Sequence, residues 1–342
     1  MTILASEMKV FRARTSSTDP AANGGRMSDV EVTSARGKLF GDITSAQLAS
    51  GLTTWEKFFV RCLSASESPG TGNINFLDFP TPYGDYGFFV AASQDGVQVD
   101  MTGSERKYAA ALVAQDITGS PSQIVITLDD AALSGMVANG NKAILTDYSP
   151  SFLRQTTGKH EIVTVSGTPT LAGLQLTVPL AAPVGGGDYT TANKARLCML
   201  YEHPGSLFPQ VQSISQGSGS VDDFTGYPLA LSHKGAERMK LSWNYISTTQ
   251  VNLSCDDPEF NSVLGTFLIA NDIAPVNPRN YAGGAPLFTW KAAGHGSPTA
   301  GASGSLDIIP SSIPFWACRV IPPNTAAILP TQYPIRGMIE SV

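Results

Sequence analysis

Short runs of apolar and β-branched residues, bounded by polar or turn-forming residues, recur along most of the chain. The clearest lie at residues 123–128, 142–146 and 160–165, where aliphatic and β-branched side chains stand between polar ones. Runs of about four to eight such residues bounded by turn-forming residues predict β-strands. Residues 171–180 and 194–201 extend the series. Residues 116–204 are therefore predicted to form a central antiparallel β barrel or sandwich.

The first 115 residues mix strand and helix signals. Strands are predicted at residues 8–13 and 55–63, and a turn at Asn23-Gly24-Gly25. A short helix is expected from an Asp42 cap to Gly51, and residues 104–115, an alanine-rich run after Ser104, form the best helix candidate. Residues 80–87 predict an exposed loop. Residues 1–115 are thus predicted to be a small N-terminal anchoring region with short helices and strands.

The last third of the chain again favours β-structure. Residues 205–226 contain Gln216-Gly217-Ser218-Gly219-Ser220 and predict a linker. Beyond it, about six strand-like runs alternate with turns rich in Pro, Gly and Asn, which predicts a C-terminal β-sandwich over residues 227–342. The expected fold class is therefore mainly β and multidomain.

Composition and charge narrow the possible partners. The 342 residues include 22 Lys and Arg against 28 Asp and Glu, which gives a net charge of −6, and only 15% of residues are charged. This balance argues against nucleic acid as a partner. No run approaches the ~18 apolar residues needed to cross a bilayer, so membrane insertion is not expected. The first sixteen residues lack the pattern of a secretory signal peptide.

The four cysteines carry no metal or redox motif. Cys62, Cys198, Cys255 and Cys318 lie far apart in sequence, in apolar surroundings, and no CxxC spacing occurs. This pattern predicts buried thiols in a reducing cytoplasm. One long-range disulfide or a four-thiolate iron–sulfur cluster is the alternative.

No motif predicts catalysis or cofactor binding. The chain has no G-x-S-x-G and no phosphate-binding loop, and His160, His203, His233 and His295 are too far apart in sequence to form a ligand pair. The acidic groups at 222–223 and 256–259 are predicted to be solvated turns. We therefore assign no catalytic, cofactor-binding or metal residue and expect no enzyme, although a triad or a carboxylate pair assembled by the fold stays open. The N-terminal basic residues suggest a solvated edge or a contact with a neighbouring acidic subunit; they are Arg12, Arg14, Arg26 and Arg36.

Two stretches carry a family resemblance. The first combines the strand at 8–13, an N-G-G-R turn at 23–26, Leu39-Phe40 and the aromatic, basic strand at 55–61. The second joins Pro286-Leu287-Phe288-Thr289 to the run at 313–322, and an Asn277-Pro278 pair precedes both. In this order they resemble virion structural proteins of tailed phages, especially relatives of Mu-like transposable phages. Residues 66–204 lie outside the resemblance.

The resemblance implies a non-enzymatic baseplate or tail-tip component that joins the tail to fibres. Its expected partners are other virion proteins and copies of itself, and its expected location is the virion tail after assembly in the bacterial cytoplasm. One alternative is an adhesin that binds host glycan or pilus through exposed aromatic residues such as Tyr83, Tyr86, Phe88 and Phe89, unless these pack in a β core. A capsid decoration protein and a glycan depolymerase are further alternatives. Trp316 is expected in the core or as an interface anchor.

Overall fold

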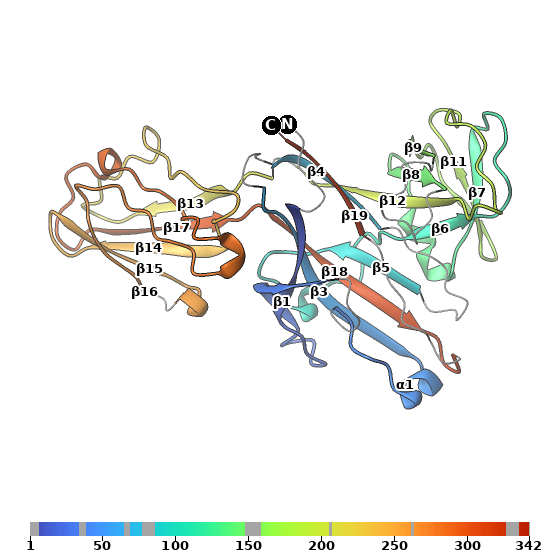
Figure 1. The fold of residues 1–342 in the computed structure, drawn as a ribbon, viewed down its shortest axis with the longest axis horizontal. Coiled ribbons are helices and arrows are strands. Elements are labelled where there is room, and N and C mark those ends of the chain that lie inside the picture. The colour runs from blue at the N-terminus through green and yellow to red at the C-terminus, as the bar shows by residue number, and fades with distance from the viewer. Residues whose placement is uncertain are drawn as a thin grey trace.

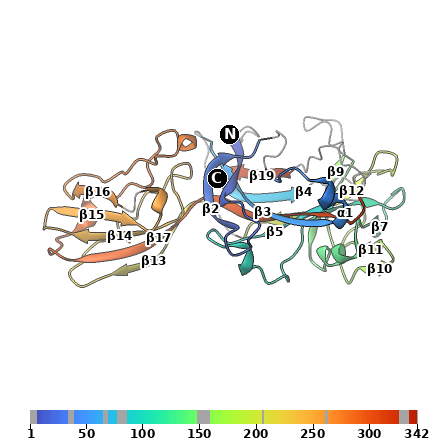
Figure 2. The same ribbon diagram turned by 90° about the horizontal axis from the view of Figure 1, so that it is seen from below.

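The fold was analysed in a computed structural model, which describes residues 7–33, 39–64, 69–76, 86–147, 159–204, 207–260, 263–325 and 335–341. The structure is mainly β, with 44% strand and 9% helix, in three antiparallel sheets. The predicted fold class is confirmed. Figures 1 and 2 show one sheet at the left of the molecule, one in the centre and one that extends to the right.

The central sheet joins the two ends of the sequence. Its strand order is β2-β1-β3-β18-β5, formed by β1 (Met8–Thr15), β2 (Gly24–Glu31), β3 (Leu52–Cys62), β5 (Tyr86–Ala91) and β18 (Ser312–Ile321). The β3 and β18 strands pair over ten residues, from Arg61 with Ser312 to Leu52 with Ile321. Successive residues are buried from Glu56 to Cys62 in β3 and from Ser312 to Cys318 in β18, so both faces of these two strands are covered there. The sandwich expected over 227–342 therefore loses its last strands to this sheet.

The right-hand sheet has nine strands, in the order β10-β11-β7-β6-β12-β4-β19, with β8 and β9 branching from β12. Strands at 123–128, 142–146 and 160–165 are present as predicted. The helix expected at 104–115 is wrong, because β6 occupies its second half with Ala110, Ala111 and Val113 buried. Tertiary packing between β7 and β12 overrides the helix preference of alanine here. The strands are β4 (Pro69–Phe76), β6 (Ala110–Val113), β7 (Gln123–Thr127), β8 (Lys142–Thr146), β9 (His160–Thr164), β10 (Thr170–Ala172), β11 (Gln175–Pro179), β12 (Arg196–Glu202) and β19 (Ile335–Ser341).

The C-terminal module contains the left-hand sheet, with strand order β13-β17-β14-β15-β16. The linker expected over 205–226 is wrong, since β13 (Gln210–Gln216) lies within it and pairs with β17 (Ser303–Ile309). The remaining strands are β14 (Met239–Tyr245), β15 (Gln250–Cys255) and β16 (Val263–Leu268). The chain enters this module after β12 and leaves it before β18, so the module is inserted into the N-terminal unit.

Alternation of side chains fixes which face of this sheet is buried. In β14, Met239, Leu241, Trp243 and Tyr245 point inward, while the residues between them are exposed or half-buried. The inner face packs against a layer of short bridged segments, including Ala230 with Thr289, Ile273 with Trp290 and Val276 with Pro286. This module therefore has a hydrophobic core of its own.

Helices are few and short. The α1 helix (Ser45–Ser50) begins at a Thr44 cap, and Gln47 completes a capping box. The predicted helix is thus confirmed, but its cap lies two residues after Asp42. It ends at Gly51, whose φ of 79° favours glycine. The 3-10 helices within the described ranges are η2 (Gln98–Asp100), η3 (Ala131–Met136), η4 (Pro258–Phe260), η5 (Asn280–Ala282) and η6 (Ala292–His295).

One aromatic core fastens the central sheet to the right-hand sheet. Phe89 stacks on Tyr108 at 5.2 Å, and Tyr201 meets Phe315 edge-on at 4.9 Å between ring centroids. Trp316 is 2% exposed and belongs to the same cluster, as a core residue. The molecule therefore consists of one large N-terminal unit with a shared core and an inserted C-terminal module.

Candidate functional site

The N-terminal unit and the C-terminal module meet at a buried arginine. Arg61 comes from the end of β3 and is fully buried. Its Nη1 donates to Glu237 Oε1 and to the Tyr281 hydroxyl, both at 3.0 Å. Its Nη2 donates to the backbone carbonyls of His233, Lys234 and Ala236 at 3.2, 3.1 and 2.6 Å. All five acceptors belong to the C-terminal module, so this one side chain connects the two parts of the chain.

The acceptors of Arg61 are held in place by their own neighbours. Glu237 also accepts hydrogen bonds from Asn277 Nδ2 at 3.1 Å and from the Tyr281 hydroxyl. Asn277 donates in addition to the carbonyl of Gly235 at 2.7 Å. The Arg61 guanidinium lies 5.2 Å from the centre of the Tyr281 ring. A planar guanidinium with fixed acceptors on several sides permits one docking geometry far better than any other.

A second group of ion pairs, more exposed than Arg61, also joins the N-terminal unit to the C-terminal module. Arg26 donates to Asp95 at 3.0 Å and to both carboxylate oxygens of Asp256, at 3.1 and 2.7 Å. Arg238 joins Asp95 at 2.9 Å to Asp307 at 3.2 Å. Burial acts to lower the pKa of Arg26, but hydrogen bonds and charges from Asp256 and Asp95 raise it above its usual range. These pairs form a second network between the two parts of the chain.

Some of the N-terminal basic residues form ion pairs with acidic residues of the same chain. Arg14 pairs with Asp257, which is 1% exposed, and lies 3.1 Å from Glu259. Arg12 lies 3.8 Å from Glu56, and Arg36 lies outside the described residues. The solvated turn expected at 256–259 is therefore wrong for Asp257. The sequence showed acidic and basic groups but not that the fold would bring them together. We call the contacts of Arg61 and this ion-pair group the junction.

A buried polar cluster lies within the C-terminal module. The Tyr245 hydroxyl donates to Asp222 and lies 3.0 Å from His295 Nδ1, while Ser220 Oγ donates to Asp222 at 2.7 Å. Burial and the Asp222 carboxylate raise the pKa of Tyr245 above its usual range. Asp222 is 6% exposed, so the solvated turn expected at 222–223 is also wrong for this residue.

This cluster does not have the geometry of a nucleophilic triad. Its serine hydrogen-bonds to the Asp222 carboxylate rather than to the histidine, so His295 is not the hydrogen-bond partner of the Ser220 oxygen as a triad histidine would be. His295 instead packs against the Trp290 ring at 4.3 Å between centroids. The cluster therefore organises the interior of the module.

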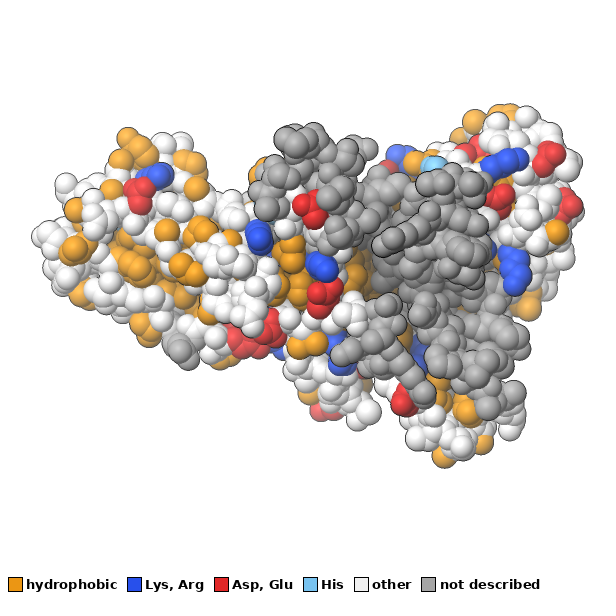
Figure 3. All heavy atoms as spheres, viewed as in Figure 1, with side chains coloured by type: hydrophobic (Ala, Val, Ile, Leu, Met, Phe, Trp, Pro, Cys, Tyr) orange, Lys and Arg blue, Asp and Glu red, His pale blue; other side chains and the backbone are white. Residues whose placement is uncertain are grey.

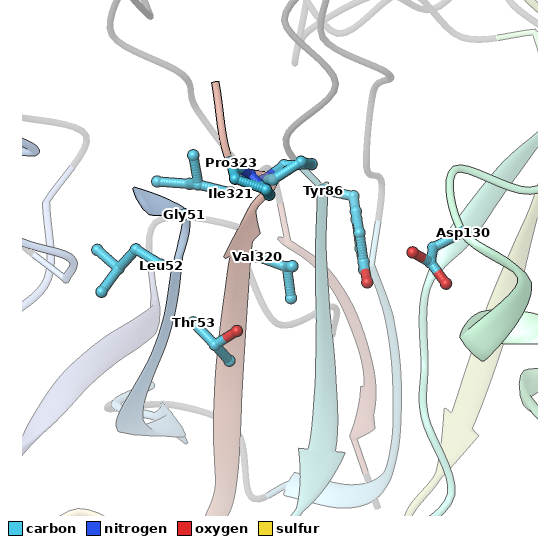
Figure 4. Close-up of a pocket in the computed structure, with 9 residues that line it drawn as sticks. Gly51, Leu52, Thr53, Tyr86, Asp130, Val320, Ile321 and Pro323 are labelled. Atoms are coloured by element: carbon cyan, nitrogen blue, oxygen red, sulfur yellow. The ribbon is translucent and has the colours of Figure 1, made fainter. Parts of the chain in front are cut away.

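A shallow pocket of about 430 Å³ lies at the end of the central sheet opposite Arg61, where β3 begins (Figure 4). It is lined by Gly51, Leu52, Thr53, Tyr86, Asp130 and residues 320–323. Burial and the neighbouring Asp130 raise the pKa of Tyr86 to about 12. Among the described residues that line the pocket, Asp130 carries the one carboxylate, and glycoside hydrolysis uses two at a defined separation.

The described residues contain no group of three or more His, Cys, Asp or Glu able to hold a metal ion. Within the same ranges, no helix is long and apolar enough to cross a bilayer. The four cysteines are buried thiols outside any disulfide, as predicted.

The aromatic residues proposed as a stacking platform are mostly in the core. Tyr86, Phe88 and Phe89 are 7%, 5% and 0% exposed, and Tyr83 lies outside the described residues. Packing in a β core, the other interpretation of these residues, is confirmed for the three. Phe88 and Phe89 therefore present almost no ring surface to a glycan, whereas Tyr86 borders the pocket of Figure 4.

Comparison of the chain with protein-family models, with curated proteins and with solved structures finds no match. Functional inference therefore depends on the junction, on the surfaces described above and on the resemblance found in the sequence.

Proposed function

We propose that this chain is a non-enzymatic structural protein of a tailed-phage virion, a baseplate or tail-tip component that joins the tail to fibres. The observation that carries the proposal is the junction around Arg61. A connecting component must hold its two attachment surfaces at a fixed angle. The buried Arg61 guanidinium, with its five acceptors in the C-terminal module, favours one such angle between the two parts of the chain.

The charge distribution supports the same role. Charged side chains are sparse over the C-terminal module at the left of Figure 3 and gather where this module meets the central sheet. A surface with few charges can pack against another subunit without the cost of desolvating ions. Buried thiols suit assembly in a reducing bacterial cytoplasm.

The proposed partners are other virion proteins and copies of this chain. An adhesin is the second candidate, although the burial of Tyr86, Phe88 and Phe89 removes most of the surface first suggested for it. A capsid decoration protein would also be a structural protein of the virion, but it would lie on the head instead of the tail. The location of the chain in the particle therefore separates a decoration protein from a tail component. A depolymerase would need a second carboxylate at the separation from Asp130 that glycoside hydrolysis requires.

Particles made without this chain test the proposal. We expect them to carry tails without fibres under the electron microscope, and we expect purified wild-type chain to restore fibres when it is added to such particles. Complete, fibre-bearing particles that form without the chain would overturn the proposal. Shortening of host polysaccharide by the purified chain would establish the depolymerase instead.

A further inference from the structure

A buried lysine of the central sheet lies in a cage of backbone carbonyls. Lys57 of β3 is 1% exposed, and its Nζ donates to the carbonyl oxygens of Gly25, Gln94 and Gly96 at 2.8, 3.2 and 2.8 Å. The Trp316 ring, whose centre lies 5.8 Å from Nζ, borders the same space. An ammonium group has three N–H donors, so these three acceptors satisfy it completely. One side chain therefore connects peptide groups from two separate segments of the chain.

The peptide groups that Lys57 binds lie beside two charged residues of the junction. The carbonyl from β2 belongs to the peptide bond before Arg26, and the other two come from the loop at 92–97, one on each side of Asp95. Arg26 Nε donates to Asp95 at 3.0 Å. The cage therefore fixes the backbone of both members of this ion pair.

Arg26 and Asp95 are also the residues through which the second network reaches the C-terminal module. Arg26 donates to both carboxylate oxygens of Asp256, and Asp95 accepts from Arg238 Nε at 2.9 Å. Asp256 directly follows β15, and Arg238 directly precedes β14. Asp256 in turn accepts from the Lys240 amide at 2.7 Å. These contacts therefore fix the ends of two strands of the module, provided that Arg26 and Asp95 are in place.

Polar contacts, of which those from Lys57 are the strongest, hold the loop. No residue of 93–97 is buried. The other contacts are neutral hydrogen bonds, from the Gly25 amide to the Gly96 carbonyl at 3.1 Å and from Gln94 Nε2 to a carbonyl of β18 at 2.7 Å. Hydrogen bonds from an ionised donor are about twice as strong as neutral ones, and burial strengthens them further. Loss of the ammonium should therefore loosen the loop more than loss of any other single contact.

We propose that Lys57 is a buried clamp for the junction, which holds Arg26 and Asp95 where they bind the C-terminal module. Within the described residues, Lys57 makes no hydrogen bond or ion pair with that module, so its effect on docking passes through these two residues. The contacts of Arg61 do not involve the clamp, so a module that loses the clamp loosens but stays attached. The inference concerns the chain itself, whatever its place in a virion.

Distances between two spin labels test the clamp in the purified full chain. Labels on Val30→Cys in β2 and Val263→Cys in β16 report on the position of the module; both valines are exposed, and the native cysteines are buried. At about pH 6, below the pKa of about 7 that burial gives Lys57, Lys57→Met should broaden the distribution of label distances. Lys142→Met is the matched control, because Lys142 pairs with Glu202 at the surface of the N-terminal unit. It should leave the distribution as narrow as in the wild type.

A second background separates the clamp from a general loss of packing. In a chain that already lacks the ion pair, Arg26→Met with Asp95→Ala, adding Lys57→Met should broaden the distribution no further. Further broadening there overturns the clamp, because Lys57 would then act on docking by another route. A wild-type distribution in folded Lys57→Met overturns it as well.

Gln94→Ala loosens the loop without removing a buried charge, so it decides the case where Lys57→Met fails to fold. It should broaden the distribution in the first background and have no effect in the second. An unchanged distribution in both backgrounds would show that the loop does not control docking and would overturn the clamp. Circular dichroism confirms that each variant is folded. Because no particle is involved, the result is independent of the test of the proposed tail role.

Discussion

Replacement of Arg61 by methionine should weaken the junction more than any other single substitution there. Methionine fills much of the same volume but offers no donor. The carbonyls of Lys234 and Ala236 lose their hydrogen bonds from the guanidinium, and Glu237 stays buried without its counter-charge. Breaking a buried ion pair from one side costs about 3–5 kcal/mol. We expect the free energy of unfolding to fall by about that amount.

Urea unfolding combined with hydrogen exchange provides the assay. Relative to the wild type, Arg61→Met should speed amide exchange more in β13 to β17 than in β3 and β18. The reason is that the C-terminal module loses its contact with the N-terminal unit while it keeps its own core. Arg196→Met is the matched control. Arg196 is also buried, but its guanidinium donates to the carbonyl of Lys194 within the N-terminal unit, so its loss should leave exchange in the C-terminal module unchanged.

A double substitution separates lost charge pairing from lost packing. Adding Glu237→Gln to Arg61→Met should recover part of the lost stability, because no uncompensated charge then stays in the interior. The reasoning would be refuted by a loss below about 1 kcal/mol in Arg61→Met, the typical value for an exposed pair. It would fail equally if Arg61→Met and Arg196→Met gave the same exchange pattern.

Three further outcomes are expected. Burial lowers the pKa of Lys57 to about 7, against the opposing charges of Asp95 and Asp100, so the folded chain binds fewer protons than the unfolded chain from about pH 7 to pH 10.5. The stability of wild type relative to Lys57→Met should therefore rise with pH across that window in urea titrations, and a flat difference would contradict the assignment. Gly24→Ala should lower the free energy of unfolding by about 2–4 kcal/mol, because φ is 110° and a Cβ would lie 2.5 Å from the Trp316 ring. Gly25→Ala, at φ 78° with open space around the position, should lower it by only about 1–2 kcal/mol in the same thermal unfolding assay. Equal losses in the two variants would dismiss the steric explanation. A thiol reagent should leave the native chain unmodified and label all four cysteines after unfolding, because all four are buried. Burial also raises the pKa of the thiols of Cys62, Cys255 and Cys318, which keeps them protonated and unreactive. Rapid labelling of the native chain would contradict their burial.

Local patterns predicted the strands better than they predicted strand partners. The strand at 123–127 is visible because buried residues alternate with less buried ones along it, and the strand at 142–146 is visible as a short apolar run whose residues after Lys142 are all buried. The partner of β3 was not predictable, since β18 lies some 250 residues away in sequence and an apolar run carries no signal of which strand it will meet. The division into sequential domains failed for the same reason.

The junction was partly visible in the sequence. The concentration of arginines near the N-terminus and the acidic run at 256–259 were both apparent. Arg61 was not singled out, because within an aromatic strand it looked like an ordinary polar position. Its burial is explained by acceptors at positions 233–237 and 281, which no local pattern connects to β3. The helix at 104–115 failed because alanine also suits a crowded strand between two others.

A density map of virus particles produced by cells that carry the gene for this chain tests the proposed tail role most directly. The account predicts repeated copies at the fibre-bearing end of the tail, each fitted by both modules in the orientation that Arg61 fixes. Absence of the chain from the tail, or a C-terminal module rotated away from β3 so that Arg61 and Glu237 are separated, would contradict it.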